Sequence, residues 1–315
     1  MLKVVVIGNL TVVIHALGVM RDFPNCDIRL VVSHPSLGGI GNFVQKWCHT
    51  HGIEHCSEEQ VNSPRMVERI GAIAPDYIFS IYNPTILRPP LLAIPTKATI
   101  NFHAGPLPSY RGMHTFSWAI INGEREYGVA WHLVDNGIDT GEVLFQRMFP
   151  ISAGETALSL SQRSFDIGVD LFRERLGALL DGTLVPSGTP PGPSVCYRRA
   201  DVPNGGLIDF SWPVERIDRF VRGLNYHPAP NPFVLATTHF SGRAFHPLKV
   251  VRIDRPGEPG RLGQVCGVEE HQIVVQAADG LVGITELLDD RRRKRRPGVL
   301  AEALGLKAGC VLGLG

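Results

Sequence analysis

The sequence lacks a charge bias and lacks long apolar runs. Its 31 Lys and Arg against 30 Asp and Glu give a formal net charge of +1, which provides no overall attraction to nucleic acid. No apolar stretch reaches the ~18 residues that suggest a membrane span. The start, MLKVVVIGNL, has no signal-peptide pattern and is typical of a buried first strand. We therefore predict a cytoplasmic protein with no membrane partner.

The sequence is also poor in paired cysteines. No two of the six cysteines form a C-x-x-C motif, which argues against a disulfide framework and against a zinc site. We predict reduced, mostly structural thiols and no metal. They are Cys26, Cys48, Cys56, Cys196, Cys266 and Cys310.

A dinucleotide fingerprint is missing as well. The turn after the first predicted strand, GNLTVVIHALG, lacks the G-x-G-x-x-G spacing that lets a backbone approach a pyrophosphate. This argues against a nicotinamide or flavin site. What is present is an alternation of apolar β-rich runs, 3–8 and 28–32, with helical patterns. It predicts an α/β fold with an open, mostly parallel, Rossmann-like sheet and helices on both faces.

Proline and glycine mark a change of organisation in the segment DGTLVPSGTPPGPSVCYRRADVPNGG, residues 181–206. After it, short apolar runs separated by Gly, Pro and Asp predict a smaller β-barrel-like domain. We predict a catalytic domain at residues 1–182, a linker at 183–205, and a barrel-like domain at 206–315. The last carries a basic run, RRRKRR, at 291–296.

The residues whose side chains could take part in a reaction lie between Ile100 and Glu142. Asn101 and His103 stand at the end of a predicted strand and, being two residues apart, point to the same side. Asp139 lies in the turn-rich loop DNGIDTG. An amide and an imidazole can donate to a developing oxyanion, the imidazole can also accept a proton, and a carboxylate can orient the ring. With no nucleophile elbow nearby, direct attack by a bound amine on an acyl donor fits best.

A family resemblance rests on these residues and their neighbours. Asn101-Phe102-His103, Arg111-Gly112 and Asp139-Thr140-Gly141, together with Trp118, Asn122-Gly123 and His132, resemble the formyltransferases that use 10-formyltetrahydrofolate. The second domain resembles the carboxyl-terminal barrel of methionyl-tRNA formyltransferase and of some amino-sugar formyltransferases. The resemblance assigns the family's catalytic triad to Asn101, His103 and Asp139.

The resemblance also implies where folate lies and what accepts the formyl group. Folate is expected against the loop after Ser80 and against DNGIDTG, with the formyl group at the triad. The expected acceptor is an amine or hydroxylamine of a small or carrier-bound metabolite, of amino-sugar, amino-acid or hydroxyornithine type. The expected pterin neighbours are Ile81, Tyr82, Ile86, Leu87, Val134, Asp135 and Gly137.

Two departures from the family pattern bear on the acceptor. Ala104, Gly105 and Pro106 stand where many members have serine and leucine, which changes the acceptor side of the site. The segment VVSHPSLGGIGNF, residues 31–43, has no Lys or Arg, whereas methionyl-tRNA formyltransferases carry a basic insertion there. This argues against tRNA as partner, although methionyl-tRNA formylation remains the alternative.

Other interpretations of single features remain open. A formyltetrahydrofolate hydrolase and a non-catalytic folate-binding protein are the remaining functional classes. His132 and Trp118 fit core or pocket-wall positions, and Arg111 fits either a contact to an anionic substrate or a solvated loop. We interpret the run Arg291–Arg296 as a solvated, mobile segment, with binding of a phosphate-bearing or acidic partner, such as a nucleotide-sugar or a carrier protein, as the alternative. The oligomeric state is not predicted.

Overall fold

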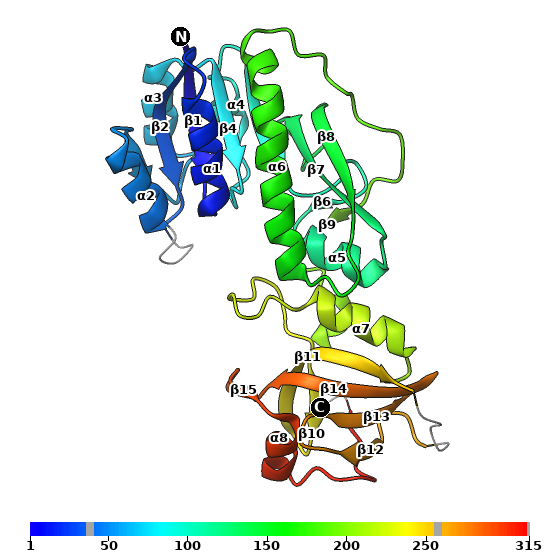
Figure 1. Ribbon diagram of the computed structural model, residues 1–315. Helices are drawn as coiled ribbons and strands as arrows, with labels where there is room; N and C mark the ends of the chain where they lie inside the picture. Colours follow the sequence, from blue (N-terminus) through cyan, green and yellow to red (C-terminus); the bar gives the residue numbers. More distant parts are fainter. Residues whose placement is uncertain (36–40, 255–259, 314–315) are drawn as a thin grey trace. The chain divides into compact units, whose positions relative to one another are not determined.

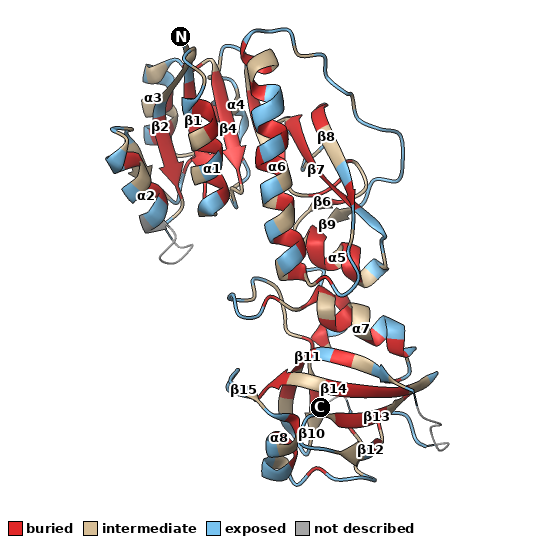
Figure 2. Cartoon of the chain, in the orientation of Figure 1, coloured by how far each residue is buried: buried red, intermediate tan, exposed pale blue. Residues whose placement is uncertain are grey.

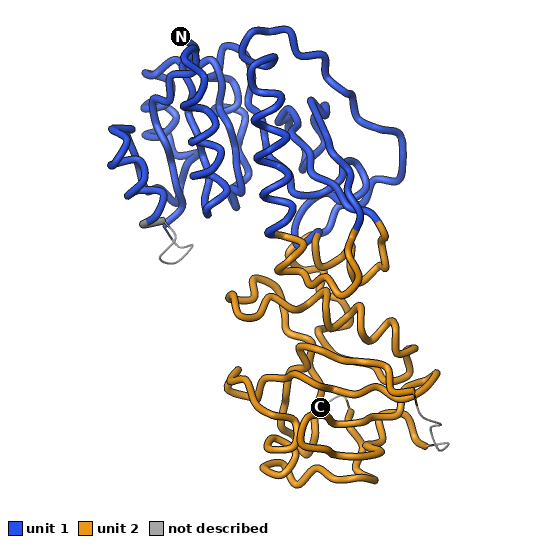
Figure 3. Tube along the Cα trace, in the orientation of Figure 1, with its two compact units in different colours: residues 1–115, 126–150, 162–197 blue, residues 116–125, 151–161, 198–315 orange. Residues whose placement is uncertain are grey.

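The computed structural model describes residues 1–35, 41–254 and 260–313 and divides into two compact units, coloured in Figure 3. Unit 1 comprises Met1–Thr115, Glu126–Pro150 and Gln162–Tyr197. Unit 2 comprises Phe116–Arg125, Ile151–Ser161 and Arg198–Gly315. The predicted linker thus contributes to both units, and the domain division at residues 182 and 206 stays a prediction.

Unit 1 is built on a seven-stranded sheet in the order β3-β2-β1-β4-β5-β7-β8 (Figure 1). The first five of these strands pair in parallel, and β7 and β8 join antiparallel at one edge. The predicted mostly parallel α/β sheet is confirmed. The strands are β1 (Leu2–Gly8), β2 (Cys26–Ser33), β3 (His55–Ser57), β4 (Tyr77–Ile81), β5 (Ala98–His103), β7 (Glu126–Leu133) and β8 (Val143–Pro150).

Helices cover the two faces of this sheet because successive strand side chains point in opposite directions. On one face, Val5 and Ile7 of β1 pack in a cluster with Met66 and Ile70. On the other, the ring of Trp131 stacks on that of Phe172, 4.2 Å between centroids. Figure 2 shows the resulting buried strands between half-exposed helices. The helices are α1 (Leu10–Arg21), α2 (Gly41–Thr50), α3 (Pro64–Ile73), α4 (Pro89–Leu92) and α6 (Ala157–Leu180).

Packing under α6 sets the direction of the polar residues of β5. Phe102 lies against Trp131, with 5.0 Å between ring centroids, and against Gly168 of α6. A Cβ at position 168 would lie only 2.3 Å from the Phe102 ring, so glycine there makes room for it. Since side chains alternate along a strand, Asn101 and His103 project from the opposite face.

Unit 2 holds a six-stranded antiparallel sheet in the order β10-β11-β14-β13-β12, with β15 beside β14. This half-barrel confirms the predicted barrel-like domain. Its core gathers Phe220 and Val221 of α7 with Phe245, Val275 and Ile284 of the strands. The elements are α5 (Thr115–Asn122, from Phe116 on), η1 (Pro203–Gly206), α7 (Val214–Gly223), β10 (Thr238–Phe240), β11 (Arg243–Ile253), β12 (Val265–Val268), β13 (Ile273–Ala277), β14 (Gly280–Leu288), β15 (Lys294–Arg295) and α8 (Pro297–Leu304).

The arginine-rich run, Arg291–Arg296, is exposed to solvent at five of its six positions, in agreement with the predicted solvated segment. Part of it also has regular structure and forms β15, which pairs with Leu287 and Leu288 of β14. Ion pairs join four of its six side chains to carboxylates. The pairs are Arg293–Asp289 at 3.0 Å, Arg295–Asp289 at 2.9 Å, Lys294–Glu286 at 2.6 Å and Arg296–Glu270 at 3.0 Å.

Three further findings concern the described residues as a whole. No helix among them has the length and apolarity that crossing a bilayer requires. They contain no group of three or more His, Cys, Asp or Glu placed to hold a metal ion. All six cysteines are free. Burial raises the pKa of the Cys26 thiol to about 12 and that of Cys48 to about 11, so both stay protonated and unreactive.

Candidate active site

The site is built around the pairing of β5 with β7. In this antiparallel pair Asn101 stands opposite His132, and cross-strand neighbours on one face are close enough for their side chains to meet. The Asn101 Nδ2 atom lies 3.1 Å from His132 Nε2. His103, two residues after Asn101, lies on the same face, as predicted.

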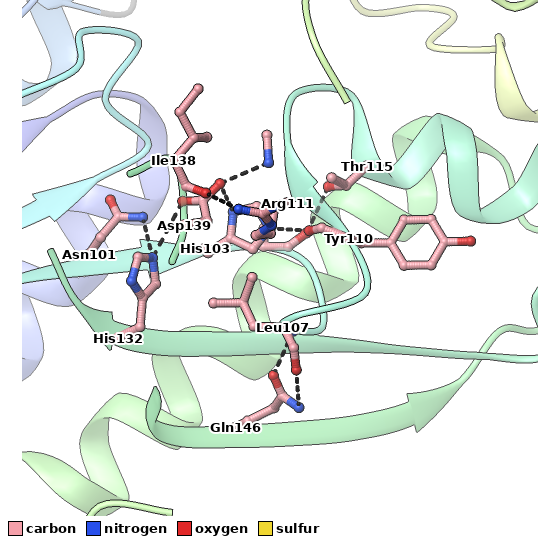
Figure 4. A network of polar contacts seen from close by, with 12 residues as sticks. Asn101, His103, Leu107, Tyr110, Arg111, Thr115, His132, Ile138, Asp139 and Gln146 are labelled. Carbon is pink, nitrogen blue, oxygen red and sulfur yellow. Dashed lines mark hydrogen bonds and ion pairs between the residues drawn. The ribbon is translucent and has the colours of Figure 1, made fainter. Parts of the chain in front are cut away.

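Asp139 joins these three residues from the loop between β7 and β8 (Figure 4). Its Oδ2 atom is 3.5 Å from His103 Nδ1, and its Oδ1 atom is 3.4 Å from His132 Nε2. The structure therefore brings together all three residues assigned to the triad. It adds His132, which contacts both Asn101 and Asp139.

The second ring nitrogen of His103 is also occupied. His103 Nε2 lies 2.6 Å from the carbonyl oxygen of Tyr110. A carbonyl only accepts hydrogen bonds, so Nε2 carries a proton. Nδ1 faces the Asp139 carboxylate at the ion-pair distance given above.

The Asp139 carboxylate is held in its ionised form. Burial alone would raise its pKa, but the charge of His103, the contacts from His132 and the backbone N–H of Gly112 outweigh burial. The Gly112 N–H donates to Asp139 Oδ2 at 2.8 Å. Together they hold the pKa of Asp139 well below its usual range, so the site contains a carboxylate anion throughout the neutral pH range.

The loop DNGIDTG is shaped to present Asp139. Asp139 itself has a φ of +50°, which is the left-handed region that non-glycine residues rarely adopt. Asp135 Oδ1 accepts from the Gly137 N–H at 3.0 Å and from the Thr140 hydroxyl at 2.6 Å, which closes the turn. A Cβ at Gly141 would lie 1.8 Å from the Leu133 carbonyl oxygen, so the loop closes tightly only with glycine there.

A second loop, residues 104–112, covers His103. A Cβ at Gly105 would lie 2.6 Å from His103 Nε2 and 2.8 Å from the Tyr110 carbonyl oxygen. The glycine that departs from the family pattern is therefore required by close contact with the imidazole. The Tyr127 hydroxyl donates to the carbonyl of Ala104 at 2.7 Å and anchors the start of the loop.

The predicted linker contributes to this loop. Cys196–Tyr197 forms β9, which pairs in parallel with β6, Arg111–Gly112. Gly112 has a φ of +87°, and a Cβ there would lie 2.1 Å from the Tyr197 carbonyl oxygen. Because the N–H of Gly112 binds Asp139, the linker strand supports the site. Arg111 Nη1 donates to the Ile138 carbonyl at 3.2 Å, which ties the two loops together.

The seven predicted folate neighbours have different environments. The side chains of Ile81 and Leu87 are buried, at 0% and 6% exposure, and Leu87 belongs to the core cluster of α3 and α4. The Ile86 side chain is 66% exposed. Tyr82 packs edge-on against Phe165 of α6, and burial raises the pKa of its phenol. The remaining three residues, Val134, Asp135 and Gly137, lie in the loop that leads to Asp139.

Sequence reasoning missed the contacts of His132. We assigned it a core or pocket-wall position, and its side chain is indeed buried. Its place beside Asn101 depends on the antiparallel register of β5 and β7, and no turn of fixed length links these strands. The sequence did hold one signal, a histidine in an otherwise apolar predicted strand that ends shortly before Asp139.

Comparison with known families accounts for most of the chain. Residues 4–176 match the Formyl transferase family, and residues 202–297 match Formyl transferase, C-terminal domain. The methionyl-tRNA formyltransferase of Citrifermentans bemidjiense is 34% identical over 263 residues, which cover 84% of this chain and 80% of that protein. That of Geobacter sulfurreducens is 34% identical over 251 residues, 79% of this chain and 76% of that protein.

Solved structures share the fold at lower identity. An N-formyltransferase from Helicobacter canadensis, in complex with folinic acid and dTDP-3-aminofucose, has a TM-score of 0.68 and 20% identity, covering 90% of this chain and 99% of that one. HypX from Aquifex aeolicus, in complex with tetrahydrofolic acid, has a TM-score of 0.61 and 18% identity, covering 96% of this chain and 47% of that one. The two-part architecture therefore recurs in proteins of distant sequence.

Proposed function

The chain belongs to the formyl transferase family, and we propose that it moves the formyl group of 10-formyltetrahydrofolate to an amine or hydroxylamine. The observation that carries this proposal is the meeting of Asn101, His103 and Asp139 on one face of the sheet. These groups supply hydrogen-bond donors for an oxyanion and an ionised carboxylate beside them. Such a set suits acyl transfer by direct attack.

The proposed reaction forms one bond and breaks one. The amine nitrogen bonds to the formyl carbon, and the carbonyl electron pair moves to oxygen. The Asn101 amide and the His103 imidazolium stabilise that oxyanion. For this, His103 gives up its contact with the Tyr110 carbonyl and donates to the oxyanion instead. Collapse breaks the bond to the folate N10 nitrogen. The amine loses one proton and N10 gains one, and the pair of Asp139 carboxylate and His103 imidazolium can take one proton and give one.

We place folate against the loop after Ser80 and the loop from Val134 to Gly137. Because Ile81 and Leu87 are committed to the protein core, the contacts proposed for them come from the backbone. The Tyr82 ring and the exposed Ile86 side chain can contribute apolar surface. Asp135 already accepts from its own turn, which supports a role in shaping the loop rather than a charged contact.

Methionyl-tRNA is the acceptor that the sequence relatives favour. Both relatives named above that are 34% identical to this chain, over 84% and 79% of its length, are methionyl-tRNA formyltransferases. They weaken the prediction, drawn from the uncharged segment 31–43, that tRNA is not a partner. Residues 36–40 of that segment lie outside the described residues. We therefore propose methionyl-tRNA as the first acceptor to test.

A small or carrier-bound amine is the second candidate, and charge pairing favours it. Binding of tRNA is dominated by unpaired basic side chains at phosphates. In the basic run, Arg293, Lys294, Arg295 and Arg296 are paired with carboxylates instead. The segment after β2 has no Lys or Arg to replace them.

Parallel assays with each acceptor test the proposal and distinguish the two acceptors. Purified protein is mixed with 10-formyltetrahydrofolate and either charged initiator tRNA or a panel of amines, including amino sugars and hydroxyornithine, and release of tetrahydrofolate is followed. We expect acceptor-dependent release. Binding of tRNA that weakens steeply with salt supports the first acceptor. Folate binding without release in any mixture would refute formyl transfer.

A further inference from the structure

Three residues of neighbouring strands form a row across the face of the sheet that carries the site. His103 of β5 stands opposite Ala130 of β7, and Ala130 stands opposite Gln146 of β8. Residues in register across a sheet point to the same side. The next residue of β8, Phe145, points to the other side, where its ring lies 6.2 Å from that of Trp131 between centroids. Gln146 therefore shares the face of His103, with one small side chain between them.

The loop of residues 104–112 crosses the sheet over these small side chains. Leu107 is buried and packs in one cluster with Ala130 of β7. Pro106 lies over Gly128, where an added Cβ would come within 3.1 Å of the Pro106 Cβ. Gly128 and Ala130 are two residues apart on β7 and point to the same side. Together they leave the loop room to lie directly on the strand.

Gln146 holds this loop by both backbone groups of Leu107 (Figure 4). Its Oε1 atom accepts from the Leu107 N–H at 2.8 Å, and its Nε2 atom donates to the Leu107 carbonyl at 3.4 Å. These are the two contacts that residues of paired antiparallel strands exchange. Leu107 is only 3% exposed, so without Gln146 both groups would lose their partner where water reaches them poorly.

The residues on either side of Leu107 contact the imidazole of His103. The Tyr110 N–H donates to the Pro106 carbonyl at 2.9 Å, which closes a turn, and the Tyr110 carbonyl oxygen lies 2.6 Å from His103 Nε2. A Cβ at Gly105 would lie 2.6 Å from the same nitrogen. A shift of Leu107 would therefore move the groups that hold the ring.

We infer that Gln146 is a positioning residue, which fixes the loop on β7 and thereby the imidazole of His103. The inference rests on the proposed function only for the reaction that the ring serves. The contacts of Gln146 are with Leu107, so its effect on His103 passes through the loop. A change at Gln146 should therefore lower the rate of the chemical step, which depends on exact placement, and leave folate binding unchanged.

Two substitutions distinguish the hydrogen bonds of Gln146 from its volume. Hydroxylamine serves as the surrogate amine, and tetrahydrofolate release is measured. Gln146→Met keeps the length of the side chain and removes both hydrogen bonds, so kcat should fall about tenfold at unchanged KM for 10-formyltetrahydrofolate. Gln146→Glu keeps an oxygen that accepts from the Leu107 N–H and should recover most of the rate. A normal kcat in Gln146→Met, or no recovery in Gln146→Glu, would overturn the inference.

A glutamine of unit 2 provides the matched control. Gln276 is half-buried like Gln146, and its Nε2 atom donates to the carbonyl groups of Ala277 and Gly280 at 2.8 and 3.3 Å. Gln276→Met removes contacts of the same kind and should change kcat by less than about twofold. Equal losses of turnover in Gln276→Met and Gln146→Met would show a general effect on folding and would contradict the inference.

The position of the ring can be measured without catalysis. The NMR signals of the His103 ring are identified by their loss in His103→Ala. In Gln146→Met we expect these signals to shift, and the Leu107 amide proton to exchange with solvent at least about tenfold faster. Gln276→Met should leave both as in wild type. Unchanged His103 signals in folded Gln146→Met would overturn the inference. If wild type releases no tetrahydrofolate with any amine, formyl transfer itself fails, and the NMR result still decides whether Gln146 positions the ring.

Discussion

Two aspartates, the half-buried Asp139 in unit 1 and the buried Asp289 in unit 2, have the same kind of surroundings and different consequences. Each accepts one or two backbone N–H groups and faces two basic side chains. For Asp289 these are the N–H groups of Arg291 and Arg293 and the guanidinium groups of Arg293 and Arg295, all at 2.9 to 3.0 Å. Asp139 has the Gly112 N–H and two imidazoles.

The cations make the difference. A guanidinium is always protonated, so the group around Asp289 can only hold the chain in place. An imidazole can gain or lose a proton near neutral pH, so the group around Asp139 can take part in proton transfer. A carboxylate with two basic neighbours is therefore not in itself a sign of catalysis. Whether it can take part in proton transfer depends on which residues those neighbours are.

The largest effect is expected from a change in the group around Asp139. Asp139→Asn removes the charge that balances His103, so turnover should fall by at least about two orders of magnitude, while folate affinity changes little. The measurement is tetrahydrofolate release under saturating folate, with folate binding measured separately. His103→Ala should act alike. Near-normal turnover in either variant would exclude that residue from the mechanism.

Asp289→Asn is the matched change in the other group. It should leave turnover within about twofold and lower stability by about 1–2 kcal/mol, a modest loss because Arg293 and Arg295 are 54% and 37% exposed. Denaturant unfolding measures it. A loss of turnover like that of Asp139→Asn, in a folded protein, would contradict the distinction between the two aspartates.

A smaller effect should follow when the carboxylate is kept and its partner is displaced. In Gly105→Ala, the new methyl group must move His103 or the Tyr110 carbonyl, which lie 2.6 and 2.8 Å from its position. Misplacement of this size should reduce turnover about 10- to 100-fold. Gly71→Ala in α3 is the control, because nothing lies within 4 Å of its Cβ position. Equal turnover in the two variants would argue against a role for His103 geometry.

Much of unit 1 could be predicted because its signals are local. The apolar runs at 3–8 and 28–32, for example, lie within the observed strands β1 and β2. Asn101 and His103 follow from strand alternation alone. Asp139 could be predicted because its loop is dense in turn residues. Asp135, Gly137 and Gly141 shape that loop in the way that such residues commonly do.

What could not be predicted depends on contacts between distant segments. The pairing of Asn101 with His132 requires the antiparallel register of β5 and β7. The support that β9 gives to Gly112 joins residues more than eighty positions apart. The ion pairs of Arg293 to Arg296 arise because β15 folds back on β14. Four of the six cations of the run thus face three carboxylates that the sequence alone does not place beside them.

A fall in pH should reduce the folding stability that each of the two aspartates contributes, over the same pH range. The backbone and cationic partners hold the pKa of Asp139 and Asp289 below the usual value of about 4. Each therefore contributes stability above pH ~4, and this is lost as pH falls toward the folded-state pKa. The difference in Tm between wild type and Asp289→Asn should be full at pH 7 and shrink at pH 3. A difference that grows in acid would contradict the assignment.

The smallest effect is expected within the basic run itself. Arg291 and Arg292 make no side-chain ion pair with any described residue, so replacing both by Ala should change stability by less than about 0.5 kcal/mol. Arg293→Ala together with Arg295→Ala should cost more, because they release Asp289. Thermal unfolding of the two double variants decides the order, and the reverse order would show that the observed pairs do not stabilise unit 2.

We propose that the group around Asp139 transfers a formyl unit. The most direct measurement follows isotope-labelled formyl in a single turnover from 10-formyltetrahydrofolate to hydroxylamine, methionyl-tRNA or another amine, in wild type and in Asp139→Asn. We expect label on the amine with wild type and at least about a hundredfold slower transfer in the variant. Equal transfer by both proteins, or no transfer by wild type to any acceptor, would contradict it.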